Sequence, residues 1–128
     1  MILAPGNSLT PFTVPGDTCT FAAAIDQNNR VTGSYGVTNQ TLGYVRHPNT
    51  NFDTFIHPGA SIDGGTVTGS FLNAQSHERG FIYVPNSGIT NIHVPGSVNT
   101  YSVSIWNGNV TGNYTYSNGI SHGYLRTP

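Results

Sequence analysis

Val-Thr-Gly-Ser-Tyr at residues 31–35 decides the fold, because the same pattern returns twice further along the chain. The later copies are Val-Thr-Gly-Ser-Phe at 67–71 and Val-Thr-Gly-Asn-Tyr at 110–114. β-Branched residues, glycine and a terminal aromatic residue are typical of strands and turns, not of helices. Repetition at roughly 40 residues is characteristic of proteins built from stacked supersecondary units. The sequence therefore predicts an all-β repeat protein.

Two further motifs keep the same spacing and divide the chain into units. A glycine followed by an aromatic and an aliphatic residue begins at Gly43, Gly80 and Gly123, and a Pro-Gly pair begins at Pro15, Pro58 and Pro95. We expect a single repeat domain over residues 1–128, with units at about 17–59, 60–96 and 97–128 and an N-terminal strand at about 9–16. The middle unit is shorter because it lacks most of its first strand.

Each complete unit is expected to form four antiparallel strands, with a tight turn between the first and second strands and a polar loop between the second and third. Asn107-Gly108 and Gly64-Gly65 supply the positive backbone φ angles that two-residue hairpin turns require. Tyr44 and Val45 show an alternation, repeated in the other units, that puts apolar side chains on both faces of the sheet. Propeller-like blades are typical of such units. The alternatives are a closed three-fold fold, such as a β-trefoil or β-prism, or a small β-barrel.

The two ends of the chain are complementary in this scheme. The third unit stops after its third strand, and residues 9–14 resemble the fourth strand of the other units. We therefore expect residues 9–14 to pair with residues 123–125, within one chain or between chains. Three blades are too few for a propeller ring, which typically has about four to eight. The expected partner is a second copy of the chain, in a homo-oligomer for which a six-bladed dimer is favoured.

Charge is sparse in this sequence. Only 7% of the residues are charged, lysine is absent, and the formal net charge is −1. Such a chain has no field that would attract nucleic acid, and it has no apolar run long enough for membrane insertion. No cofactor-binding motif is present, so no cofactor is expected. The low charge suits an oligomeric or adhesive protein.

The repeat resembles the HAF repeat of secreted bacterial proteins. The resemblance rests on residues 25–35, on Ser-His-Gly-Tyr-Leu at 121–125 and on residues 89–96, and it covers nearly the whole chain after residue 8. It implies a propeller-like array and an extracellular or cell-surface location, and it implies no settled activity. The shortened second unit and the small number of repeats depart from an ordinary monomeric propeller.

One rim of the expected blades collects most of the histidines. Because neighbouring strands run antiparallel, the loops between second and third strands share this rim with the Pro-Gly corners. Candidates for acid–base catalysis there are His77, Glu78 and His122. No metal is expected, and His57 and His93 are the candidate ligands if one binds. The simpler interpretation, which we prefer, is that these are variable, solvated positions of the repeat.

The opposite rim carries candidates for ligand binding. Trp106 and Asn107 lie in the hairpin turn of the third unit, where the other units place Asp26 and Asp63. An indole face beside amide and carboxylate groups suits a sugar ring, whose C–H face stacks on aromatic surfaces. The simpler alternative is that Trp106 covers a hydrophobic gap or a subunit contact. Tyr116 and Arg79, on the first rim, complete the set of candidate ligand-binding residues.

Low charge, repetition and abundant Asn, Thr and aromatic residues favour a non-enzymatic ligand-binding or adhesion module. Carbohydrate is the expected ligand class, as in a lectin. One alternative is a small β-barrel-like enzyme, an isomerase or hydrolase that uses His and Glu on the loop rim. The other is a purely structural repeat of a surface assembly.

Overall fold

The computed structural model describes residues 8–17, 19–37 and 40–128. Within these residues the chain forms eleven strands and no helix, so no helix of the described part is long and apolar enough to cross a membrane. The first sheet holds β1 (Thr20–Ile25), β2 (Val31–Val37), β3 (Gln40–Arg46) and β4 (Phe52–Phe55). The second holds β5 (Ser61–Asp63), β6 (Thr66–Leu72), β7 (Glu78–Val84) and β8 (Gly88–Ile92). The third holds β9 (Asn99–Trp106), β10 (Asn109–Thr115) and β11 (Ser121–Arg126).

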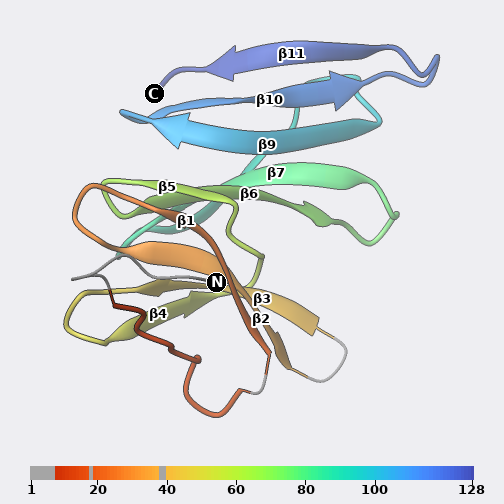
Figure 1. The fold of residues 1–128 in the computed structure, drawn as a ribbon. Helices are drawn as coiled ribbons and strands as arrows, with labels where there is room; N and C mark the ends of the chain where they lie inside the picture. Colours follow the sequence, from red (N-terminus) through yellow and green to blue (C-terminus); the bar gives the residue numbers. More distant parts are fainter. Residues whose placement is uncertain (1–7, 18, 38–39) are drawn as a thin grey trace.

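The predicted all-β class is confirmed, and each sheet is built from one repeat unit. Strands that follow one another in sequence lie side by side and run antiparallel, in the orders β1-β2-β3-β4, β5-β6-β7-β8 and β11-β10-β9. Figure 1 shows the three sheets as layers, with the second sheet between the other two. β1 and β2 contact β5, and β9 packs across β5, β6 and β7. The layers therefore follow the order of the repeats.

Turn chemistry sets the strand lengths. Gly64 and Gly65 both have positive φ angles, as do Asn107 and Gly108, so the β5–β6 and β9–β10 hairpins turn in two residues as expected. The first strand of the middle unit is short, as predicted, and β5 has only 3 residues. The fourth strands end earlier than the sequence pattern suggests, at Phe55 and Ile92, ahead of the Pro-Gly corners.

Two apolar layers between the sheets form the core. Phe81 packs on one face of the second sheet, in a cluster with Val45 and Phe55 of the first sheet. Its neighbour Ile82 packs on the other face, with Ile105 and Val110 of the third sheet. The predicted alternation of aromatic and aliphatic side chains is thus confirmed, because a strand places successive side chains on opposite faces.

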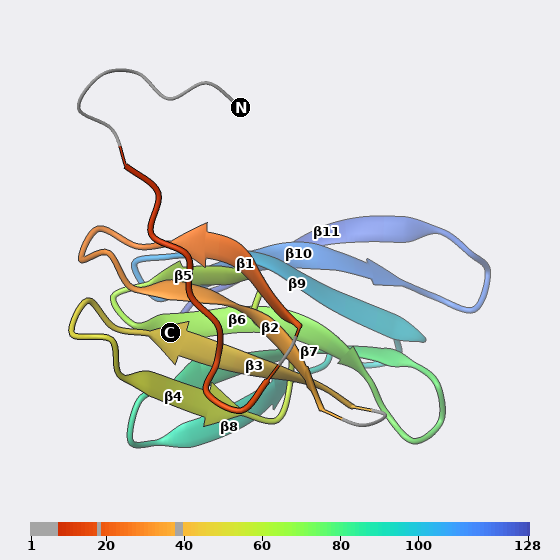
Figure 2. The ribbon, with the colours of Figure 1, turned by 60° about the horizontal axis from the view of Figure 1, so that its bottom comes forward.

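The prediction that residues 9–14 pair with residues 123–125 is wrong within one chain, and pairing between chains stays a prediction. These residues form no strand, and they do not pair with β11. Instead Phe12 packs against Tyr44 and Phe52, with the Arg46 guanidinium 4.9 Å above its ring, and Val14 is buried in the same cluster. The N-terminal segment, red in Figure 2, therefore covers the outer face of the first sheet. β11 lies in the third sheet, at the other end of the stack, and is out of its reach.

The stack is open. Among the described residues, extensive contacts join the first sheet to the second and the second to the third, and none joins the first to the third. A β-trefoil, a β-prism or a small barrel would bring the first and third sheets together, so these alternatives do not describe this chain. Propeller-like blades remain compatible with the stacking order.

Candidate functional site

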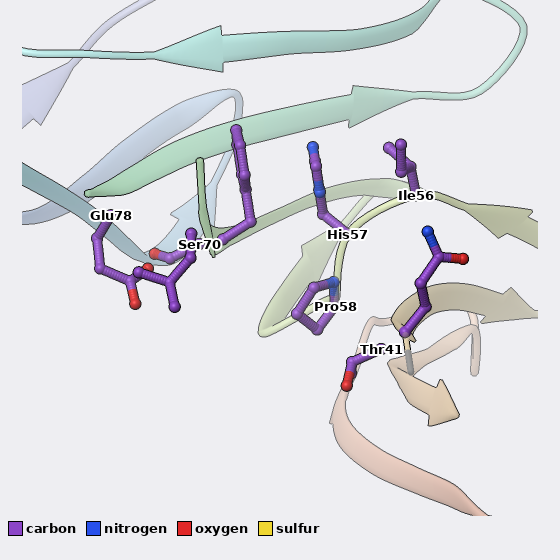
Figure 3. A pocket seen from close by; sticks show the side chains of 9 residues that line it. Thr41, Ile56, His57, Pro58, Ser70 and Glu78 are labelled. Atoms are coloured by element: carbon purple, nitrogen blue, oxygen red, sulfur yellow. The ribbon is translucent and has the colours of Figure 1, made fainter. Parts of the chain in front are cut away.

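A groove opens between the first and second sheets, on the rim that carries the loops between second and third strands. It encloses about 660 Å³. Residues from the start of β3, from the segment after β4, and from the facing ends of β6 and β7 line it. These lining residues are Gln40, Thr41, Ile56, His57, Pro58, Ser70, Phe71, Leu72 and Glu78. In Figure 3, Glu78 and Ser70 lie at one end of the groove, Thr41 and Ile56 at the other, and His57 and Pro58 between them.

The lining combines apolar surface with neutral hydrogen-bonding groups. Ile56 and Leu72 are 58% and 62% exposed, so both offer apolar surface to a ligand in the groove. Gln40 and Thr41 contribute an amide and a hydroxyl, and Glu78 contributes the single acidic group. This mixture of apolar faces and a few polar groups is typical of small-molecule sites.

His57 is held rigidly in the groove wall. Its ring stacks on Phe71 with centroids 3.6 Å apart and planes 2° apart, and it also contacts Phe81. Burial lowers the pKa of His57 below its ordinary value, because a charged imidazole is poorly solvated there. His57 is therefore a neutral, flat surface at neutral pH.

On the opposite rim, the two aspartates predicted to bind ligand, Asp26 and Asp63, both form hydrogen bonds to the neighbouring sheet. The Asp26 carboxylate is buried, accepts hydrogen bonds from Arg30, and reaches the backbone N–H of Gly65 in the next unit at 3.1 Å. The Asp63 carboxylate likewise accepts a hydrogen bond from the backbone N–H of Asn107. The Asp26 carboxylate is thus buried and fully engaged, whereas Asp63 is only partly buried and its hydrogen bond is exposed.

Trp106 stands apart from that pattern. It occupies the same turn position as Asp26 and Asp63, at the end of β9, and it is 69% exposed. Asn107 beside it donates its backbone N–H to Asp63, so the turn is fixed while the indole is free. The indole of Trp106 is thus open to solvent, unlike the buried carboxylate of Asp26 at the equivalent position.

The candidate catalytic residues are not joined into one constellation. His122 is exposed and packs on Tyr114 and Tyr116, with ring centroids 5.2 and 5.7 Å away. His77 donates its backbone N–H to Asn73 in the preceding turn. Within the described part of the chain, no hydrogen bond or ion pair joins the side chains of His77, Glu78 and His122.

The remaining first-rim candidates have structural partners. Arg79 donates through Nη1 to the backbone carbonyls of Glu78 and Val98, and so ties β7 to the segment before β9. Tyr116 belongs to the aromatic cluster with Tyr114 and His122. The hydrogen bonds of Arg79 thus give it a structural role, while Tyr116 stays partly exposed.

The candidate metal ligands are not assembled either. His57 stacks on Phe71, and the ring nitrogen of His93 lies 3.3 Å from the carbonyl oxygen of Ser97. Among the residues that the structure describes, no three His, Cys, Asp or Glu side chains form a group that could hold a metal ion.

Most groove residues were missed by sequence reasoning, which named only His57 and Glu78 among them. Ile56 and Leu72 come from different repeat units and meet only because the first two sheets stack. One clue was present: the ends of the second and fourth strands share a rim, so residues 56–58 and 70–72 could have been placed on it together.

Comparisons with known proteins identified no relative of this chain. No family model matches the chain, and neither the search of characterised proteins nor that of solved structures found a similar protein. The resemblance to HAF-type repeats therefore stays an expectation.

Proposed function

We propose that the protein is a non-enzymatic binding module whose ligand lies in the groove between the first and second sheets. The observation that carries this proposal is the groove itself, about 660 Å³ in volume, with exposed aliphatic side chains beside neutral polar ones. An extracellular or cell-surface setting, implied by the resemblance to secreted repeats, is part of the same proposal.

Carbohydrate is the ligand class that fits this lining best. A sugar ring offers C–H faces to apolar side chains such as Ile56 and Leu72, and hydroxyl groups to Gln40 and Thr41. Lysine is absent from the chain and Glu78 is the only acidic residue of the groove, so an anionic ligand would find little attraction. A neutral oligosaccharide is therefore proposed.

The test begins with a glycan array probed with the full chain, followed by titration of the best ligand. Leu72→Ala and Gln40→Ala are expected to weaken binding by about 10-fold each, which is the effect of losing one good contact. Trp106→Ala is the matched control, since its indole is exposed on the opposite rim. If Trp106→Ala abolishes binding and the groove variants do not, the site lies on the opposite rim and the proposal fails.

A catalytic function of the same groove is the second candidate, because His57 and Glu78 both line it. A neutral imidazole can act as a general base. If the bound sugar is chemically altered, and His57→Ala together with Glu78→Gln stops the reaction while binding persists, the module is an enzyme.

A further inference from the structure

The outer face of the third sheet is exposed, whereas the equivalent faces of the first and second sheets are buried. In the first two sheets, Val45 and Ile82 point toward the next sheet and are 1% and 7% exposed. Leu125 has the same position in β11 and is 69% exposed, because none of the sheets that the structure describes packs on it. The strand register places Trp106 on this face too, beside Asn109 and Thr111. The third sheet thus ends the stack with unpartnered apolar side chains.

The polar groups of this face are also arranged as in a buried one. Thr32 and Thr68 are completely buried between sheets, and each donates its hydroxyl to the backbone carbonyl of an aromatic residue, Tyr44 or Phe81. Thr111 makes the equivalent bond to Tyr124 at 2.9 Å while exposed. The hydroxyl of Thr111 is therefore already satisfied internally, so that another sheet can cover it without leaving a polar group unpaired.

At Gly123, no described atom lies close enough to exclude a larger residue. At the equivalent positions Gly43 and Gly80, a Cβ atom would overlap the backbone carbonyl of His57 or the hydroxyl of Ser102. At Gly123 the nearest atom to an added Cβ would be the Gly112 carbonyl oxygen, 3.8 Å away. In the first two sheets this space is filled by the fourth strand or by the next sheet. Among the described residues, neither a fourth strand nor a further sheet lies beside β11.

The N-terminal segment lies where the fourth strand of a preceding sheet would lie. It enters β1 through a corner that matches the corner between β8 and β9. In both corners the valine N–H donates to a threonine hydroxyl, Val14 to Thr20 at 3.0 Å and Val94 to Thr100 at 3.1 Å. Gly16 and Gly96 complete the corners with φ angles of 83° and 81°. Residues 9–14 therefore stand before the first sheet as β8 stands before the third.

We propose that a second copy of this chain stacks head to tail on the third sheet, with its residues 9–14 added to β11 as the missing fourth strand. The register follows from the other sheets. β3 pairs with β4 through Gly43 and Phe55 and through Arg46 and Phe52, and β7 pairs with β8 in the same way. Leu9 of the second copy then lies opposite Arg126, and Phe12 opposite Gly123.

A second copy fits this face because the outer face of its first sheet is equivalent to the sheet faces that pack on Val45 and Ile82 within one chain. The Val45 face of the first sheet packs on the Phe81 face of the second sheet. The Ile82 face of the second sheet packs on the third sheet in the same way. The contact is heterologous, so it closes only when the last copy meets the first. Two copies provide six sheets, within the range of about four to eight that closed propellers use. A closed dimer leaves neither face exposed.

The mass of the full chain in solution tests the contact. We expect wild-type protein to sediment with twice the chain mass of 13.6 kDa. Leu125→Asp should raise the dimer dissociation constant by on the order of 100-fold, because it places a charge in the centre of the interface. Leu125 is exposed in the single chain, so the variant should keep the melting temperature that the wild-type chain has when it is diluted to a monomer. Ile120→Asp is the matched control, since Ile120 is exposed in the loop before β11, and it should stay dimeric.

A cysteine pair tests the head-to-tail register. Leu9→Cys with Arg126→Cys, in a Cys19→Ser background, should form a disulfide between chains, because opposite residues on paired strands lie within disulfide reach. Leu9→Cys with Ile120→Cys should not. A wild-type chain that stays monomeric at micromolar concentration would overturn the proposal. So would a dimer that Leu125→Asp dissociates but that gives no Leu9–Arg126 cross-link, since that dimer would pack face to face.

Discussion

The Asp26 carboxylate accepts a hydrogen bond from the backbone N–H of Gly65, 39 residues further along the chain, at 3.1 Å. The same carboxylate accepts bonds from the side chain and the backbone of Arg30. One buried side chain thus fixes the first hairpin turn and attaches it to the second sheet. This bond adds to the apolar cluster of Val45, Phe55 and Phe81 that already joins the first and second sheets.

Replacing Asp26 should therefore destabilise the whole stack. We expect Asp26→Ala to lower the free energy of unfolding by about 2 to 3 kcal/mol, since a buried charged group with several hydrogen bonds is lost. Asp63→Ala should have a smaller effect, because the Asp63–Asn107 bond is exposed. Urea denaturation of both variants measures the difference. Equal effects would show that burial of Asp26 is not the cause.

The pH dependence of stability should report the same carboxylate. Burial alone would raise the pKa of Asp26, but hydrogen bonds from the Arg30 side chain and the backbone outweigh it, so the pKa lies below its usual value of 3.8. The folded state therefore binds fewer protons than the unfolded state. The stability that Asp26 contributes is complete above the unfolded pKa and is lost as pH falls through the folded one. The stability difference between wild type and Asp26→Asn should shrink below about pH 4. A difference that stays constant with pH would contradict this.

Close packing between the second and third sheets should make Gly80 intolerant of a side chain. A Cβ at Gly80 would overlap the Ser102 hydroxyl, which is hydrogen-bonded to the Tyr124 hydroxyl at 2.7 Å. We expect Gly80→Ala to cost about 1 to 3 kcal/mol, the usual effect of overpacking. Gly123→Ala is the matched control, because it meets open space in the single chain. Thermal unfolding of each variant, measured where the chain is monomeric, gives the comparison. Equal losses would rule out the steric cause.

The N-terminal segment should stabilise the first sheet even though it forms no strand. Phe12 contacts Tyr44 and Phe52 at ring-centroid distances of 6.0 and 6.1 Å, and its ring supports the Arg46 guanidinium. We expect Phe12→Ala to lower the unfolding free energy by about 2 kcal/mol, below the range for a fully buried Phe. Thr10→Ala, at an exposed position, should change it little. Unchanged stability of Phe12→Ala would mean that the segment does not cover this sheet in solution.

Local pattern was enough to predict the strands but not how the sheets meet. The three Val-Thr-Gly copies became β2, β6 and β10, and the alternation at Tyr44 and Val45 placed the two side chains on opposite faces. Asp26 was expected to face a ligand because the sequence shows only that it lies in a turn. Its real partner, Gly65, belongs to another repeat, and only the stacking of two sheets brings them together. The groove was missed for the same physical reason.

Binding of a ligand in the groove between the first and second sheets can be observed residue by residue in solution. Nuclear magnetic resonance of the isotope-labelled chain during titration with the neutral oligosaccharide selected on the array tests it most directly. We expect the largest amide shift changes at Thr41, Ser70 and Leu72, which line the groove. Changes confined to Trp106 and Asn107, on the opposite rim, would contradict it.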